Sequence, residues 1–244
     1  RMCHRVLMAD VRGGEGFKTP GEFRLSQNWI GGTGPANAMY VPPVATNIDA
    51  YMTDIENYIH NGMHPNLVKA ALIHYQFETL HPFQDGNGRI GRLLILLFLI
   101  DKEILHSPTL YISLYLKKKQ NEYYASLTKV RDTSDYIQWI QFFLEGVIAV
   151  SEQTMTTTKK IIALENRDRA RLKTGTAIKA FDVLLKKPVV TIKDMQEELG
   201  VTNATANALV KKLEADEILV QKNNKQRYRV YSYKEYIDII EMGL

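Results

Sequence analysis

The sequence has little cysteine and no long hydrophobic run. Cys3 is the single cysteine in 244 residues, so no disulfide can form within the chain, and this composition favours a reducing cytoplasm. The longest apolar run, residues 93–100, is much shorter than the ~20 residues that a membrane-spanning helix needs. We find no signal peptide, and we therefore predict a cytoplasmic protein with no membrane partner.

Two frequent site signatures are also missing. The sequence has no G-x-x-x-x-G-K-[ST] segment, which excludes a P-loop nucleotide site. Zinc is an alternative to consider, because four histidines lie within one stretch of the chain: His60, His64, His74 and His81. However, there is no His-Glu-x-x-His pair and no cysteine cluster, so the sequence gives zinc little support.

The charge and length of the chain exclude little. A net charge of +4 does not by itself imply a nucleic-acid or membrane partner. The 244 residues are enough for two domains. The chain starts with Arg1 rather than Met, and from this we expect that the N-terminal part of a longer protein is missing.

The spacing of apolar residues predicts a mainly α fold. Glycines and prolines between residues 13 and 43 indicate loops around a small β-hairpin, with strands at 24–30 and 38–41. From Asn47 the apolar period is helical. Helices are predicted at about 47–61, 65–80, 89–102, 122–130 and 136–164.

The C-terminal part of the chain has a different pattern. Short helices are predicted at 176–185, 193–199 and 202–216, and strands at 218–220 and 228–231. This order is that of a winged helix-turn-helix. We therefore predict a first domain at 1–150, a linker helix at 151–175 and a winged helix-turn-helix domain at 176–244.

The most informative stretch runs from His81 to Arg92. Gly86 and Gly88 flank Asn87 just before a predicted helix. Glycines let backbone N–H groups turn toward one point, and a helix N-terminus adds partial positive charge there, which favours phosphate. Arg89 and Arg92 are three residues apart on the first turns of that helix and could hold further phosphates.

Two side chains beside this predicted phosphate site could take part in a reaction. Asp85 is an oxygen ligand of the kind that Mg²⁺ combines with substrate phosphates. His81 lies four residues before Asp85, and a histidine can take the proton of an attacking hydroxyl. Taken singly, such residues are more often a turn and a structural histidine. Within one twelve-residue block, they favour nucleotide-dependent group transfer.

This block resembles the motif of the Fic family, H-x-F-x-[DE]-G-N-G-R-x-x-R, at every specified position, and the resemblance extends over about Cys3 to Val150. It implies a Fic helical core and transfer of AMP from ATP to a protein. His81 would be the general base on a Ser, Thr or Tyr hydroxyl, and Asp85 would hold Mg²⁺. The N–H groups of Gly86 to Gly88 and the Asn87 amide would bind the α-phosphate.

The resemblance implies further contacts with the nucleotide and the target. Arg89 and Arg92 would hold the β- and γ-phosphates, and Gly91 would keep that face of the helix open to the nucleotide. Tyr124 would line the nucleoside pocket, with Tyr123 a weaker candidate. The hairpin around Trp29 and Ile30 would be a flap that clamps the target segment by strand pairing. The sequence is equally consistent with Trp29 being an aromatic residue of the hydrophobic core.

One departure from the family concerns regulation. Many members carry an inhibitory helix with the pattern [ST]-x-x-x-E-[GN]. Here Glu165-Asn166 has Ile161 at the Ser/Thr position, and Glu145-Gly146 has Gln141. We expect that such a helix precedes the fragment or is a separate protein.

Three hypotheses of function remain. The first is protein adenylylation, with ATP as substrate, Mg²⁺ as cofactor, an exposed hydroxyl residue of a protein as target, and self-modification possible. The second is a DNA-binding regulator whose Fic core senses a nucleotide. The third is a Fic-fold transferase that uses another donor. The winged helix could bind DNA, dock the target or form a homodimer.

Overall fold

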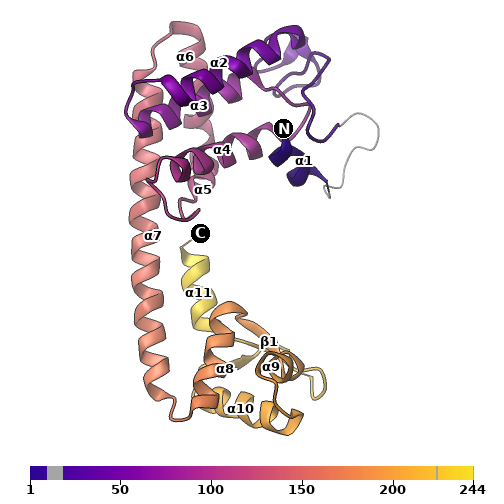
Figure 1. Ribbon diagram of the computed structural model, residues 1–244, viewed down its shortest axis with the longest axis vertical. Coiled ribbons are helices and arrows are strands. Elements are labelled where there is room, and N and C mark those ends of the chain that lie inside the picture. Colours follow the sequence, from indigo (N-terminus) through magenta and orange to yellow (C-terminus); the bar gives the residue numbers. More distant parts are fainter. Residues whose placement is uncertain (10–18, 224, 244) are drawn as a thin grey trace. The chain divides into compact units, whose positions relative to one another are not determined.

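The computed structural model describes residues 1–9, 19–223 and 225–243. The chain divides into two compact units, Arg1–Ser151 and Glu152–Leu244 (Figure 1). Both are mainly helical, and the described residues form one three-stranded sheet, which lies in the second unit. Across the same residues we find no helix whose length and apolarity would let it span a bilayer.

The first unit is built from helices. They are α1 (Met2–Met8), α2 (Ile48–Asn61), α3 (Asn66–Leu80), α4 (Asn87–Asp101), α5 (Ile112–Lys118), α6 (Gln120–Thr133) and the first part of α7 (Ile137–Arg171), with short 3₁₀ turns η1 (Pro35–Asn37) and η2 (Ala45–Asn47). The predictions for α2, α3, α4 and α6 are confirmed to within three residues at each end. The sequence reading missed α1 and α5, which have seven residues each and no side-chain cap.

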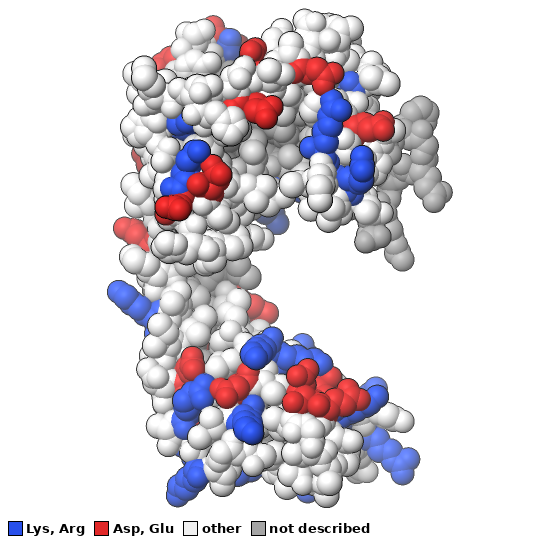
Figure 2. All heavy atoms as spheres, in the orientation of Figure 1, with Lys and Arg blue, Asp and Glu red and all other residues white. Residues whose placement is uncertain are grey.

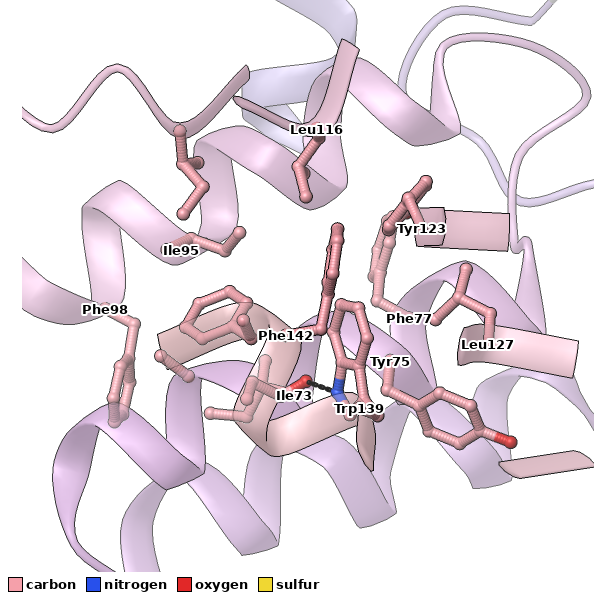
Figure 3. Close-up of a cluster of buried hydrophobic side chains, with 14 of the residues drawn as sticks. Ile73, Tyr75, Phe77, Ile95, Phe98, Leu116, Tyr123, Leu127, Trp139 and Phe142 are labelled. Atoms are coloured by element: carbon pink, nitrogen blue, oxygen red, sulfur yellow. Dashed lines mark hydrogen bonds between the residues drawn. The ribbon is translucent and has the colours of Figure 1, made fainter. Parts of the chain in front are cut away.

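The core of this unit surrounds α3. The Trp139 ring from α7 is fully buried and packs near Phe142 and Tyr123 (Figure 3). Its Nε1 donates a hydrogen bond of 2.9 Å to the Ala71 carbonyl. Burying an aromatic ring of this size with its N–H group satisfied is strongly favourable. α3 is therefore fixed on several sides, and so is the residue at its C-terminal end, His81.

The predicted β-hairpin is shorter than expected. Pairing is limited to a single antiparallel bridge between Ile30 and Tyr40, and residues 24–29 do not form a strand. The reason is that Arg24 and Asn28 are buried and bind another partner. The Arg24 Nε donates to the His81 carbonyl at 3.0 Å, and the Asn28 Nδ2 donates to the Phe83 carbonyl at 3.1 Å. This segment is thus tied to the motif loop rather than to residues 38–41.

The second unit combines four short helices with the sheet. In chain order the elements are α8 (Gly175–Lys186), β1 (Val189–Thr191), α9 (Ile192–Leu199), α10 (Asn203–Ala215), β2 (Val220–Gln221), β3 (Val230–Ser232) and α11 (Lys234–Met242). The sheet is antiparallel with strand order β1-β3-β2. Thr202 caps α10 as predicted, accepting from the Thr205 N–H at 3.3 Å. Helix α11 was not predicted.

The tail of α7 contributes to the second unit. Residues 151–175, predicted as a linker helix, are helical as far as Arg171. Leu164 and Leu172 are buried in the same hydrophobic cluster as Phe181 of α8. Tyr233 donates a hydrogen bond of 2.7 Å to the buried Asp168. The order of elements after this tail is compatible with a winged helix, which remains a prediction.

Candidate active site

The motif forms the loop between α3 and α4. His81 ends α3 in the left-handed region, with φ of 48°, and its N–H donates to the Phe77 carbonyl at 2.9 Å. Gly86 caps the start of α4 with φ of 78°, a conformation that glycine adopts at little cost. The N–H groups of Asn87 and Gly88 in the first turn of α4 have no acceptor within the helix. The loop thus places a histidine beside a helix N-terminus.

Asn87 holds the loop closed. Its side chain is 1% exposed; its Oδ1 accepts from the Phe83 N–H at 2.8 Å and its Nδ2 donates to the Phe83 carbonyl at 2.7 Å. Both ends of the amide are therefore occupied by the backbone of one residue. In the structure these bonds fix the loop, and the contact of the Asn87 amide with an α-phosphate stays a prediction.

Gly91 lies at the contact between α4 and α3. It is buried there, and the predicted role of keeping this face of α4 open to the nucleotide stays a prediction. A Cβ at this position would lie 2.5 Å from the Glu78 Oε1 and 3.3 Å from the His74 ring. Glycine is therefore required here because α3 and α4 approach each other closely, which in turn sets the distance between the two ends of the motif.

A cavity of about 430 Å³ opens beside the loop. It brings together many of the predicted site residues: Ile30, His81, Gly88, Arg92, Tyr123 and Tyr124. Trp29, Asp85 and Arg89 are not among its lining residues. The Asp85 Oδ2 lies 3.8 Å from an Nη of Arg89, and both side chains are partly exposed. Trp29 is 40% exposed, so it is not a core aromatic.

His81 is neutral in this setting. Burial lowers its pKa to about 4, although a hydrogen bond to the Glu78 carbonyl opposes the shift. The Nδ1 of His81 lies 3.3 Å from that carbonyl oxygen. Because a carbonyl oxygen only accepts, Nδ1 carries the proton in this contact. The Nε2 then keeps its lone pair, so the ring is in the form that can accept a proton from a hydroxyl group.

Two charged residues that sequence reasoning did not assign also line the cavity. Burial raises the pKa of Glu78 to about 7, and the nearby Arg92 and Arg131 oppose the shift. The guanidinium of Arg131, from α6, lies 3.6 Å from the centre of the Tyr40 ring. A signal for Glu78 existed, since it is an acidic residue on the inward-facing side of an apolar helix. No local signal pointed to Arg131.

Buried groups continue behind the cavity. His74 is fully buried, which lowers its pKa to about 4, and its Nε2 lies 3.0 Å from the Tyr123 Oη. Burial also raises the pKa of Tyr123. The partnership with His74 fixes the Tyr123 ring, which is 6% exposed, whereas Tyr124 is 37% exposed and is the more accessible of the two.

Asp85 fits a magnesium ion that is shared with phosphates. Its Oδ1 accepts a hydrogen bond of 2.7 Å from the Gly86 N–H, and the carboxylate is 38% exposed. Mg²⁺ commonly binds one protein carboxylate and completes its shell with phosphates and water. No three His, Cys, Asp or Glu side chains within residues 1–9, 19–223 and 225–243 converge as a metal site, so the zinc alternative finds no support among them.

Comparison with known proteins finds similarity to one family over the part of the chain that contains this loop. Residues 1–99 match the model of the Fic/DOC family. The chain is similar to the protein adenylyltransferase Fic of Drosophila grimshawi, with 30% identity over 146 residues, 58% of this chain and 26% of that protein. It is also similar to a probable protein adenylyltransferase of Aquifex aeolicus, with 34% identity over 93 residues, 38% of this chain and 28% of that protein.

The fold comparison covers more of the chain. A crystal structure of a Fic family protein from Desulfovibrio desulfuricans G20 aligns with 95% of this chain and 66% of its own, at a TM-score of 0.58 and 20% identity. This likeness concerns the fold. The chain spans about a quarter of the length of the curated relatives it matches.

Proposed function

We propose that this chain, whose residues 1–99 match the Fic/DOC family, transfers AMP from ATP to a hydroxyl group of a target protein. The observation that carries the proposal is the common cavity of His81, Gly88 and Arg92. A neutral imidazole, the N-terminal turn of α4 and a guanidinium face the same space. A proton acceptor beside an anion site is what attack of a hydroxyl on a phosphate requires.

The proposed reaction is one displacement at the α-phosphorus. The target oxygen forms a bond to that phosphorus, the bond to the α,β-bridging oxygen breaks, and pyrophosphate leaves with the electron pair. The Nε2 of His81 takes the hydroxyl proton. Backbone N–H groups of Asn87 and Gly88 hold the α-phosphate, and Arg92 and Arg89 hold the outer phosphates. Asp85 would hold Mg²⁺, which when bound neutralises phosphate charge.

The rest of the cavity suggests where the other substrate parts lie. Tyr124 and Tyr123 line it on the α6 side, and we assign the nucleoside to that side. Ile30 borders the same cavity, and its N–H and carbonyl are used in the bridge with Tyr40. The flap would therefore pair with the target segment through the residues beside Ile30. Trp29 is adjacent and exposed, which favours a contact with the target.

We test the proposal with ATP labelled at either the α- or the γ-phosphate. The wild-type chain, Mg²⁺ and a bacterial lysate are incubated with each donor, and labelled protein bands are compared. AMP transfer predicts label on protein from the α-position only, whereas phosphorylation predicts label from the γ-position. If neither donor labels protein although ATP still binds, a transferase that uses another donor or a nucleotide-sensing regulator is favoured. Bands of the chain itself report self-modification, so they are scored apart from lysate proteins.

For the second unit we propose a winged helix that binds DNA, and the supporting observation is how its charges are distributed. The face drawn in Figure 2 carries both basic and acidic side chains. Along the sequence, however, two segments of this unit carry only basic ones. Residues 202–213 and 220–233 contain no Asp or Glu. They carry Lys211, Lys212, Lys222, Lys225, Arg227 and Arg229. An Nη of Arg229 donates to the Asn207 Oδ1 at 3.1 Å, which joins the segment after β2 to α10.

This proposal predicts DNA binding that depends on salt. We expect the double variant Lys225→Ala with Arg227→Ala to bind a fluorescent duplex about tenfold more weakly, with a salt slope lower by up to about 2, because each phosphate contact releases counterions. Fluorescence anisotropy at several salt concentrations measures both. The control removes two exposed lysines of α7, Lys159 and Lys160. Equal losses in both double variants, or no wild-type binding at low salt, would contradict a DNA interface in this unit.

A further inference from the structure

His4, on the N-terminal helix α1, lies directly behind the motif loop. Its side chain is buried, with 5% of the residue exposed, and its ring stacks on Phe83 at 3.8 Å with an interplanar angle of 5°. The Nε2 lies 3.0 Å from the Asp85 carbonyl oxygen. On the other side of the ring, the Gly21 N–H donates to Nδ1 at 2.8 Å. The proposed reaction gives this histidine no role.

The two contacts fix the protonation of the ring. Since Gly21 donates to Nδ1, that nitrogen is an acceptor and carries no proton. A carbonyl oxygen only accepts, so Nε2 carries the proton and donates to Asp85. His4 is therefore the neutral Nε2–H tautomer, and each ring nitrogen is used by a different segment of the chain.

The carbonyl that His4 holds belongs to the peptide between Asp85 and Gly86. The N–H of the same peptide points the opposite way because the peptide is planar and trans, and it donates to the Asp85 Oδ1 at 2.7 Å. Fixing the carbonyl thus also fixes the donor that orients the carboxylate. Rotation of this peptide would be easy without such a contact, because Gly86 has φ of 78° and no side chain to resist it.

We propose that His4 is a positioning residue that locks the Asp85–Gly86 peptide with its carbonyl turned toward α1 and away from the phosphate site. A rotated peptide would turn a carbonyl oxygen, with its negative partial charge, toward the phosphates and release the Asp85 carboxylate. Met8, also on α1, packs closely against Gly86, since a Cβ on Gly86 would lie 2.8 Å from the Met8 sulfur atom. The inference deepens the proposed function by adding α1 to the nucleotide site.

Two variants separate the contacts of His4. In His4→Gln the side-chain amide can still donate to the Asp85 carbonyl but no longer accepts from Gly21, and in His4→Asn the reverse holds. Both lose the stacking on Phe83. We expect His4→Asn to weaken ATP binding and to slow transfer about tenfold, the usual effect of one lost hydrogen bond. We expect His4→Gln to stay within about threefold of wild type on the same argument.

The readouts keep this inference apart from the proposed function. Calorimetry measures ATP affinity with EDTA and with Mg²⁺, thermal denaturation measures Tm, and α-labelled ATP measures transfer. Ile55→Val in the core of α2 serves as a control of reduced stability. No transfer by wild type would overturn the proposed function and leave the binding comparison valid. Equal ATP affinity of the Asn and Gln variants, or a loss that follows Tm alone, would overturn the role of His4.

One measurement needs no variant. Nitrogen-15 NMR of the wild-type chain labelled at histidine reports which ring nitrogen carries the proton, and the His4 ring is assigned through its contacts with Phe83. We expect the neutral Nε2–H tautomer at neutral pH. A doubly protonated ring or the Nδ1–H tautomer would contradict the inference even if neither variant folds.

Discussion

Replacing His81 with alanine is expected to lower AMP transfer by a factor of about 10² to 10⁴, the usual contribution of a general base. The neutral ring, with its Nδ1 donating to the Glu78 carbonyl, leaves Nε2 as the basic nitrogen beside the cavity. Alanine keeps the backbone of the loop and removes only that base. We therefore expect ATP affinity to change less than about twofold, because the phosphate-binding N–H groups remain.

The matched control is His106→Ala, which removes an exposed histidine and should retain wild-type transfer. Turnover with α-labelled ATP and calorimetric ATP affinity are measured for all three proteins. A His81→Ala protein that keeps more than a tenth of wild-type turnover would show that the base is another group. A parallel loss of ATP affinity would assign His81 to nucleotide binding instead.

Much of the fold follows from sequence because its signals are local. The apolar period of α2, α3, α4 and α6 placed each helix to within three residues, since one buried face repeats with the helical turn. The motif loop was also placed correctly, because its glycine and its helix start are neighbours in the chain. Short elements such as α5 lack enough turns to show a period.

The contacts of the site are harder to predict because they join distant residues. His4 meets Asp85 across 81 positions, and Arg131 of α6 contacts Tyr40, which lies in the bridge with Ile30. Asn87 and Gly91 show a second limit. The sequence analysis singled out both residues, but only the structure shows that Asn87 binds the Phe83 backbone and that Gly91 makes room for Glu78.

Glu78 makes the stability of the first unit depend on pH. Its pKa rises from 4.5 to about 7 because the carboxyl is buried, so between these values the folded chain binds a proton that the unfolded chain does not. The contribution of this proton to the unfolding free energy is fully present below pH 4.5 and is lost as pH rises through 7. His74 and His81 act in the opposite direction. Their pKa falls from 6.5 to about 4, so their contribution is present above 6.5 and is lost as pH falls toward 4.

Glu78→Gln removes the carboxyl titration while leaving both histidines in place. We expect the difference in unfolding free energy between the variant and wild type to rise in favour of the variant by about 2 to 3 kcal/mol from pH 5 to pH 8, since each unit of pKa difference corresponds to about 1.4 kcal/mol. Urea denaturation followed by tryptophan fluorescence measures this, and Trp29 and Trp139, the two tryptophans of the chain, both lie in the first unit.

The control for this measurement is Glu56→Gln, which removes an exposed carboxyl of α2 and should give the same difference from wild type at both pH values. A Glu78→Gln difference that does not change with pH would mean that Glu78 titrates in the folded chain as it does in the unfolded one. The buried carboxyl beside Arg92 would then be charged throughout the neutral range. It would compete with a phosphate for that guanidinium, so the same experiment decides whether Glu78 or a bound phosphate neutralises the charge of Arg92.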